Sequence, residues 1–546
     1  MTQSPAGTPA APDSPPPFRN YVEAVLEALA ADPGRTVLTD PDGCRTTAGT
    51  LYEDVYRTAA ELAARGVGRG STLAVLSGNR PEALVTRYAA NLLGARVAFL
   101  HEVIHTQLAP EVVARIGRSV GTTLWLIDPA LRDLAGSLLS QQDLAPVLFL
   151  GPGGPGGPEE DLAACAARRP GTPVASAARP EDDWCIRMTG GSTGTPKNVC
   201  VTFEKYLRVV TDRAALMRSR PPRPGEDGEA LCFLACASIA HSAGTTVDGV
   251  LLAGGRVVLH RGFDPGAVLD TIERERVTDV WLLSPMLGQV LDHPRAGTAG
   301  TGSLRWLGYG GHLLSPARAE RAAEVFGPVL HGWYGQTEVG LICEAGPHEH
   351  RRIGRMGQIT AGRPIPGVEL VVRDAAGRPL PVGEVGEIRV RSWQLMSGYW
   401  EQPALSAEVL SDGWLRTGDA GYLDEEGYLF LCGRYKEVIK LAGSHQVFPA
   451  ELEGFLLTHP DVEECMVFGV RRPDDAEEVH AAIVPAPGRT LDPAVIREFV
   501  TSRKGPLYAP SELHLLPEMP LNAVGKPDKK QVQDRLGLTR ASVTVY

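Results

Sequence analysis

WCIRMTGGSTGTPKNV, the stretch from Trp184 to Val199, begins like a strand and then breaks into glycines and hydroxyl-bearing residues. The break opens with four small residues in a row, Gly190, Gly191, Ser192 and Thr193. Backbone N–H groups in such a loop can approach anionic oxygens closely, and the hydroxyls add further donors. Lys197 supplies a mobile positive charge for a phosphate. The pattern GxxxxGK[ST] is absent, so this is not a Walker A loop, and read alone the segment also fits an ordinary turn.

A second polar segment lies further along the chain. HGWYGQTEVG, from His331 to Gly340, brings Tyr334, Gln336, Thr337 and Glu338 together. Glu338 suits Mg²⁺, which prefers a carboxylate in combination with phosphate oxygens. Together with the glycine-rich loop, this segment favours a site for a nucleotide and its metal ion.

Two later segments add basic and acidic candidates. Asp419 and Arg434 lie in the stretch from Asp412 to Lys440 and are candidates for binding ribose hydroxyls. PLNAVGKPDKK, from Pro520 to Lys530, places Lys526 in a turn near the C-terminus. Taken alone, Lys526 has the character of a solvated surface lysine. A functional role for Lys526 is therefore indicated only when it is considered together with the other motifs.

The order and wording of these motifs resemble the ANL superfamily of adenylate-forming enzymes, which includes acyl-CoA synthetases, adenylation domains and luciferases. The resemblance extends from about Tyr21 to Leu536, nearly the whole chain. Motifs in this order over such a span are far more specific than any one of them. The resemblance implies an enzyme that uses ATP to convert a carboxylic acid to its adenylate, and a rival interpretation is an inactive nucleotide-binding scaffold with the same fold.

The resemblance also assigns roles to individual residues. TGGSTGTPK corresponds to the family's phosphate loop, with Gly190 in place of the usual serine and Asn198 in place of the usual glycine. It implies phosphate binding by Thr189, Gly191, Ser192, Thr193, Gly194 and Lys197. YGGH corresponds to the end of the adenine-binding strand, which implies cofactor-binding roles for Gly310, Gly311 and His312.

YGQTE, which includes Gly335 and Gln336, corresponds to the family's YGxTE motif. The resemblance places Tyr334 against adenine, Thr337 on the α-phosphate and Glu338 on Mg²⁺. Asp419 and Arg434 correspond to the ribose ligands, and Glu437 stands at the hinge position. Lys526 corresponds to the lysine that bridges the acyl carboxylate and the α-phosphate.

Hydrophobic patterning predicts an α/β fold with more than one domain, because 546 residues exceed one ordinary core. Helical spacing in Leu51–Val67 precedes a buried strand in Ser71–Asn79, and a helix followed by a strand is predicted from Pro81 to Leu100. From Gly362 to Val390 the pattern becomes strand-like. Together with the resemblance, these patterns predict a disordered lead at 1–17 and an adenylation domain at 18–433, which consists of α/β layers and a β-rich subdomain. A small, mobile α+β C-terminal domain that carries Lys526 is expected at 434–546.

Composition narrows the class of protein. The 54 Lys+Arg against 65 Asp+Glu give a net charge of −11, which argues against a general nucleic-acid binder. None of the nine cysteines forms a CxxC pair, and the simplest interpretation is free thiols in a reducing compartment. Neither a secretory signal nor a membrane-spanning apolar run is recognisable, so we expect a soluble cytoplasmic protein without a membrane partner.

The acyl pocket is expected around ASIAHSAGTT, from Ala237 to Thr246. By resemblance His241 stands at the family's gate position, although a buried core histidine is an equally good interpretation. Ser242 replaces the aspartate of domains that activate α-amino acids, so an aryl or bulky acyl acid is favoured. Small residues such as Ala243, Gly244 and Gly249 leave room for a planar ring. The expected pocket comprises His241, Ser242, Gly244, Tyr309, Gly310, Trp333, Val339 and Leu341, with His241, Thr337 and Lys526 as catalytic candidates.

The acceptor of the activated acid is expected to be CoA. KLAGSHQVFPAELE, from Lys440 to Glu453, resembles the loop that the family presents during thiol attack. The expected cofactors are thus ATP, Mg²⁺ and CoA, and a carrier protein acting in trans is the alternative acceptor. Some relatives activate nitrite with ATP to diazotise an aryl amine, and the departures at Gly190, Asn198 and Phe203 leave that alternative open.

Overall fold

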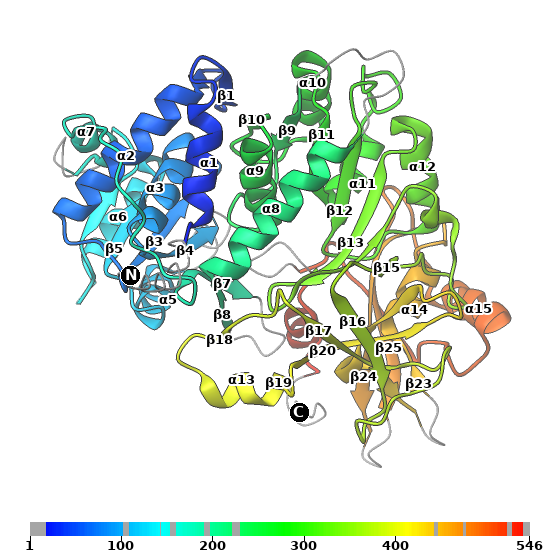
Figure 1. Cartoon of the computed structure of the whole chain (residues 1–546). Helices are drawn as coiled ribbons and strands as arrows, with labels where there is room; N and C mark the ends of the chain where they lie inside the picture. Colours follow the sequence, from blue (N-terminus) through cyan, green and yellow to red (C-terminus); the bar gives the residue numbers. More distant parts are fainter. Residues whose placement is uncertain are drawn as a thin grey trace, which may run out of the picture.

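A computed structural model describes residues 18–101, 109–141, 143–152, 160–189, 197–220, 230–441, 446–472, 477–520 and 527–538. It has a mixed α/β architecture with a large N-terminal domain and a small C-terminal domain (Figure 1). Within the described residues, the larger domain contains two mainly parallel sheets and a third, antiparallel sheet. The expected fold class is therefore confirmed.

The first sheet has the strand order β18-β8-β7-β4-β3-β5-β6. Its strands are β3 (Thr72–Ser77), β4 (Arg96–His101), β5 (Leu124–Ile127), β6 (Val147–Phe149), β7 (Asp183–Thr189), β8 (Lys197–Thr202) and β18 (Gly398–Tyr399). The helices and 3₁₀ turn of this region are α1 (Tyr21–Ala30), α2 (Ala48–Ala64), α3 (Pro81–Leu92), α5 (Pro110–Ser119), η1 (Pro129–Leu131), α6 (Arg132–Leu139) and α7 (Leu162–Ala166). The helix and strand predicted from Leu51 to Asn79 are both present.

The second sheet has the order β15-β14-β13-β12-β11-β9-β10-β1-β2. Its strands are β1 (Thr36–Thr39), β2 (Arg45–Thr47), β9 (Cys232–Ala235), β10 (Arg256–Leu259), β11 (Asp279–Leu283), β12 (Trp306–Gly310), β13 (Leu330–Gln336), β14 (Gly340–Ala345) and β15 (Arg363–Pro364). The accompanying helical segments are α8 (Phe203–Ser219), α9 (Ser242–Leu252), α10 (Pro265–Glu275), α11 (Ser284–Asp292), α12 (Pro316–Phe326) and η2 (Glu349–Arg351).

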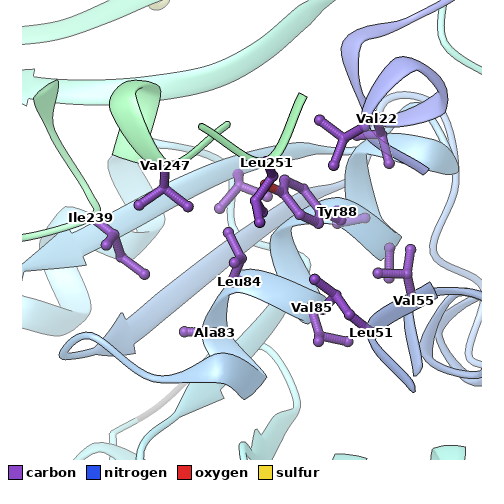
Figure 2. Close-up of a cluster of buried hydrophobic side chains, with 14 of the residues drawn as sticks. Val22, Leu51, Val55, Ala83, Leu84, Val85, Tyr88, Ile239, Val247 and Leu251 are labelled. Atoms are coloured by element: carbon purple, nitrogen blue, oxygen red, sulfur yellow. The ribbon is translucent and has the colours of Figure 1, made fainter. Parts of the chain in front are cut away.

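One apolar layer joins the two sheets. Successive residues of β3 point to opposite faces, so Leu73 and Val75 enter the shared core while Ala74 and Leu76 enter the core beneath α5 and α6. The same alternation places Phe233 of β9 in the shared core. Figure 2 shows this layer, where Val247 and Leu251 of α9 pack beside Leu84 and Tyr88 of α3. The sequence of layers is therefore helix, sheet, helix, sheet, helix.

The β-rich part of the domain forms an antiparallel sheet in the order β16-β17-β20-β19, with β21 paired to β20. Its elements are β16 (Val368–Arg373), β17 (Gly386–Ser392), α13 (Pro403–Val409), β19 (Leu410–Ser411), β20 (Trp414–Leu423) and β21 (Leu429–Arg434). Its core includes Tyr334 and Val339 from the second sheet and Tyr399 from the first. This packing brings β13 of the second sheet and β18 of the first sheet against the antiparallel sheet.

The chain enters the C-terminal domain directly after β21. Its elements are η3 (Tyr435–Glu437), β22 (Ile439–Lys440), β23 (Gln446–Val447), α14 (Pro449–Leu456), β24 (Val462–Arg471), β25 (Glu477–Pro485), α15 (Pro493–Lys504), β26 (Glu512–Leu515) and α16 (Lys529–Arg535). The sheet β24-β25-β26 supports the domain's own apolar cores. No helix in the described part of the chain is long and apolar enough to cross a membrane.

Candidate active site

The glycine-rich segment is framed by two strands of the first sheet. β7 and β8 pair antiparallel, and Thr189 and Lys197 are cross-strand partners at the end of this pairing. The hydroxyl of Thr189 donates to the carbonyl of Lys197 at 3.4 Å, which ties the ends of the two strands together. The intervening residues 190–196, which include the predicted phosphate ligands Gly191, Ser192, Thr193 and Gly194, lie outside the described residues.

Lys197 and Glu338 both contact Tyr399, a residue that the sequence patterns did not single out. Tyr399 of β18 pairs with Val199 of β8, so its ring lies next to the end of the hairpin. The ammonium of Lys197 lies 5.2 Å from the centroid of this ring. The Tyr399 hydroxyl donates to Oε1 of Glu338 at 3.0 Å. The phosphate lysine and the metal carboxylate predicted from the sequence therefore both contact Tyr399, one at its ring and the other at its hydroxyl.

The protonation of Tyr399 suits this role. Burial, reinforced by the negative charge of Glu338, raises the pKa of Tyr399 above its ordinary value. The hydroxyl consequently stays protonated across the physiological range and acts as a donor to the carboxylate. The backbone of Glu338 is fixed as well, because its carbonyl accepts a 2.7 Å hydrogen bond from the N–H of Met396.

The carboxylate of Asp419, in β20, accepts hydrogen bonds from residues of two other strands, β13 and β21. It lies opposite Arg434 in the β20–β21 pairing, and Nη1 of Arg434 donates to its Oδ1 at 2.8 Å. Its Oδ2 accepts from the hydroxyl of Tyr334 and from Nε2 of Gln336, both at 2.7 Å. Gln336 also donates to the carbonyl of Thr417 at 2.9 Å. The two predicted ribose ligands and two residues of YGQTE thus form one hydrogen-bonded group.

The remaining residues of YGQTE lie at the turn between β13 and β14. A Cβ at Gly335 would lie 2.3 Å from the carbonyl oxygen of Gly340, so the irregular pairing at this point requires glycine. Thr337 is half-buried in the turn, between Gln336 on Asp419 and Glu338 on Tyr399. Burial, followed by the charge of Asp419, holds the pKa of Tyr334 well above its ordinary value, so the phenol remains a donor.

The predicted adenine-binding strand end lies beside this turn. Gly310 ends β12 and pairs with Trp333 of β13. The hydroxyl of Ser284 donates to the carbonyl of His312 at 2.7 Å, which fixes the chain after the strand. Gly311 has a φ of 86°, a left-handed conformation that favours glycine. Gly311 and His312 are both exposed, and their role in binding adenine stays a prediction.

The expected acyl-pocket residues do not lie in one place: two are exposed at the start of α9, and most of the others lie in or next to strands of the second sheet. His241 and Ser242 are exposed at the start of α9, so the alternative of a buried core histidine is wrong. Trp333 packs against Trp281 with the rings tilted by 34° and their centroids 4.7 Å apart, on the opposite side of β13 from Tyr334. Val339, in contrast, is fully buried in the core of the β-rich sheet.

Tyr309 is buried as well, and its hydroxyl lies 3.1 Å from Nε2 of His350, within hydrogen-bond distance. Leu341 is half-buried in β14, opposite Gly335 in the strand pairing. Leu341 therefore lies close to the turn between β13 and β14, whereas Tyr309 of β12 belongs to the core that this sheet shares with α10, α11 and α12.

The expectation that small residues open the pocket is not supported at two positions. A Cβ at Gly244 would lie 1.9 Å from the carbonyl oxygen of Ile239, so this glycine permits close packing of the turn before α9. A Cβ at Gly249 would lie 2.5 Å from Cγ of Arg213, so that space is filled by an arginine. Both glycines satisfy the packing of α9 and leave no empty volume for a ring.

The donor set fits a magnesium ion carried in with a nucleotide. The described residues contain no group of three or more His, Cys, Asp or Glu side chains that could hold a metal ion. Mg²⁺ commonly relies on one or two carboxylates together with phosphate oxygens, so it needs no such cage. Tyr399 engages Oε1 of Glu338, and the carboxylate has a second oxygen for a hard cation. Glu338 is therefore a suitable protein ligand beside Lys197.

Glu437, the hinge candidate, forms an ion pair with Lys529, which lies 92 positions later in the chain. Nζ of Lys529 lies 2.9 Å from Oε2 of Glu437 in a partly exposed ion pair. This contact connects η3, at the start of the C-terminal domain, with α16. Lys526, three residues before Lys529, lies outside the described residues. Its predicted catalytic role stays a prediction.

Comparisons with known proteins agree over most of the chain. The family model of the AMP-binding enzyme matches residues 25–400, and that of the AMP-binding enzyme C-terminal domain matches residues 451–526. A medium/long-chain-fatty-acid–CoA ligase of Mycobacterium tuberculosis is 32% identical over 511 residues, covering 90% of this chain and 86% of the relative. A feruloyl-CoA synthase of Amycolatopsis sp is 32% identical over 506 residues, covering 91% and 95%. The solved structure of the amide bond synthetase McbA from Marinactinospora thermotolerans superposes with a TM-score of 0.83 at 33% identity, covering 94% of this chain and 99% of that one.

Proposed function

The chain belongs to the AMP-binding enzyme family, and from this premise we propose that it converts an aryl or bulky acyl acid to its adenylate and then to a CoA thioester. Its coarse activity is that of an AMP-forming ligase that activates a carboxylate with ATP. The identity of the acid, the thioester step and the individual residue roles are the parts that we propose.

The observation that carries the proposal is the convergence around Asp419 and Glu338. Asp419 accepts hydrogen bonds from Tyr334, Gln336 and Arg434. Glu338, two residues after Gln336, is bonded to Tyr399 beside Lys197. An acidic group suited to ribose hydroxyls thus lies at one end of YGQTE, and a carboxylate with a lysine suited to a metal-bound phosphate lies at the other. A nucleoside triphosphate has these groups in this order.

The chemical difficulty of the reaction explains why such residues are needed. A carboxylate is a weak nucleophile here because its negative charge is repelled by the phosphates it must attack. Holding both anions in line and spreading the charge lowers this barrier. Lys197 would neutralise the departing pyrophosphate, and Thr337 would donate to the α-phosphate. Mg²⁺ on Glu338 would supply further charge neutralisation when it is bound.

Lys526 completes the proposed mechanism. In the first step a carboxylate oxygen of the acid forms a bond to the α-phosphorus, and the bond from that phosphorus to the pyrophosphate oxygen breaks. Lys526 would contact the acyl carboxylate and the α-phosphate at once, which offsets the charge at the reacting atoms. In the second step a thiolate attacks the acyl carbon and AMP leaves. Because Lys526 belongs to the C-terminal domain, rotation of that domain would separate the two steps.

CoA is the acceptor that we favour. Relatives with about a third of their residues identical are named CoA ligases or CoA synthases, and they are matched over nearly their full lengths. A second candidate acceptor is an amine, because the superposed structure at 33% identity is an amide bond synthetase. Both acceptors attack the same acyl carbon, so the first step and its residues would be unchanged. The described residues give no observation that favours nitrite activation or an inactive scaffold.

A pyrophosphate-release screen over aryl, cinnamic, fatty and amino acids tests the proposal. The active acids are then incubated with ATP and, separately, with CoA, an amine or hydroxylamine, and the products are identified by mass spectrometry. We expect an aryl or bulky acyl acid to give a hydroxamate with hydroxylamine and a thioester with CoA. Pyrophosphate release without hydroxamate would contradict acyl-adenylate formation. Formation of an amide without a thioester would identify the amine, and not CoA, as the acceptor.

A further inference from the structure

Arg213 of α8 is a half-buried arginine with one buried, unused donor. Its Nη1 atom is buried and has no hydrogen-bond partner among the described residues. No carboxylate of the described residues lies within ion-pair distance of it. Arg87, whose side chain is almost fully buried, provides the contrast, because it is paired with the fully buried Asp248. A buried donor without a partner is costly, so its presence at Arg213 calls for an explanation.

The surroundings of Arg213 are aromatic. Its Cζ lies 4.1 Å from the ring centroid of Trp333, which is an energetically useful cation–π distance. Trp333 in turn lies 4.7 Å from Trp281 and 4.9 Å from Trp306. Gly249 of α9 gives Arg213 its space, because a Cβ there would meet the arginine side chain. Trp281, Trp306 and Trp333 lie in β11, β12 and β13. Figure 1 shows α8 running beside α9 in front of this sheet.

The charged groups near Arg213 do not fully balance the positive charge of its guanidinium. Burial, followed by the positive charge of Arg220, lowers the pKa of Arg213 to about 10. Arg220 is itself paired with Asp279. The carboxylate of Glu344 acts on Arg213 in the favourable direction but is within hydrogen-bond distance of His331 at 2.8 Å. The charge of Arg213 is therefore only partly balanced from within the described chain.

Trp333 connects this arginine to the proposed active site. It directly precedes Tyr334, whose hydroxyl contacts Asp419, and it points to the opposite side of β13. We take the body of an acid whose carboxylate is activated near Thr337 to lie on the Trp333 side of the strand. An aromatic body suits a surface of indole rings. The guanidinium above Trp333 would then face the distal end of the acid.

We propose that Arg213 is a specificity-determining residue that selects aromatic acids with a second carboxylate remote from the one that is adenylated. This inference rests on the proposed function, since it assumes that the acid is activated beside Thr337. A guanidinium matches a carboxylate by two parallel N–H···O hydrogen bonds, which an uncharged ring substituent cannot provide with the same strength.

Matched aromatic acids test the inference. Acid-dependent pyrophosphate release is measured with benzoate, 4-hydroxybenzoate, isophthalate and terephthalate in the wild type, Arg213→Met and Arg213→Lys. Arg208→Met is the control, because Arg208 also lies on α8 and over an indole ring but is exposed. We expect at least one dicarboxylate to exceed benzoate in kcat/KM by about tenfold or more in the wild type. Arg213→Met should lower kcat/KM for that dicarboxylate by roughly 30-fold or more, leave benzoate within about threefold, and be partly rescued by lysine.

Several outcomes would overturn the inference without touching the proposed function. These are a preference for benzoate or 4-hydroxybenzoate in the wild type, or an Arg213→Met variant that loses all acids equally while remaining folded. If Arg213→Met does not fold, the selectivity of the wild type and of Arg213→Lys decides the matter. The failure of every acid in the wider screen would instead contradict the proposed function itself.

Discussion

The phenolic hydroxyl of Tyr399 donates a 3.0 Å hydrogen bond to the carboxylate of Glu338. The two residues come from different sheets, since Tyr399 pairs with β8 whereas Glu338 follows β13. The contact fixes the carboxylate that we assign to the metal beside the lysine that we assign to phosphate. The relative position of the first two sheets therefore bears directly on the proposed chemistry.

Tyr399→Phe should weaken the metal site. Loss of the hydroxyl leaves the Glu338 carboxylate without the donor that orients it, and hydrogen bonds to charged groups contribute about 1.5–3 kcal/mol. We expect the Mg²⁺ concentration for half-maximal activity to rise by roughly tenfold. Tyr422→Phe is the matched control, because its hydroxyl accepts from the backbone of Arg355 instead. Equal Mg²⁺ dependence in both variants would contradict a role for Tyr399 in orienting the metal carboxylate.

Asp419→Asn should weaken nucleotide binding. The substitution preserves shape but removes the charge that Arg434, Tyr334 and Gln336 share. We expect KM for ATP to rise by roughly tenfold or more, because charge-assisted hydrogen bonds are lost. Asp212→Asn, which alters an exposed carboxylate on α8, should leave KM within about twofold. Steady-state kinetics with varied ATP make the comparison, and an unchanged KM in Asp419→Asn would exclude a ribose-binding role.

Gly244→Ala should destabilise the N-terminal domain. Its Cβ would lie 1.9 Å from the carbonyl oxygen of Ile239, which belongs to the backbone and cannot rotate away. We expect a loss of about 3 kcal/mol in the free energy of unfolding. Gly136→Ala in α6 meets no atom within 4 Å and should be neutral or slightly stabilising. Denaturant unfolding of both variants distinguishes a packing glycine from one that merely leaves room for substrate.

Glu61 should contribute to stability in a pH-dependent way. Burial alone raises its pKa, but hydrogen bonds from Arg169 and Arg65 outweigh burial and hold the pKa below its usual value. Its contribution is therefore present above the pKa of the unfolded chain and is lost as pH falls through the lower folded pKa. Glu61→Gln should melt about 2 °C or more below the wild type at pH 7, with a smaller gap near pH 4. A gap that stays constant between these pH values would contradict the assignment.

The parts of this molecule that depend on local pattern were predictable. α3 was placed correctly because Pro81 suits the first turn and its apolar residues repeat at helical spacing. β3 was recognised because all of its residues are buried and apolar residues dominate it. Tyr334, Gln336, Asp419 and Arg434 were singled out from their motifs, and the structure brings them together.

The rest depends on contacts between distant segments. Tyr399 was missed because only its pairing with Val199, 200 positions earlier, places it beside Glu338. Arg213 lies in an ordinary helical pattern, and its burial is set by Trp333 and Gly249. Gly249 was interpreted as an opening because a glycine in a sequence does not reveal which neighbouring side chain fills its space.

Exchange of labelled pyrophosphate into ATP, measured with a substrate acid and without any thiol, is the most direct test of the account. Formation of an acyl adenylate before thiol attack predicts exchange that requires the acid and Mg²⁺ and proceeds without CoA. Lys526→Ala should reduce this exchange by about a hundredfold or more, whereas Lys530→Ala, which alters an exposed lysine of α16, should retain it. Exchange that requires CoA, or release of phosphate in place of pyrophosphate, would contradict the central claim.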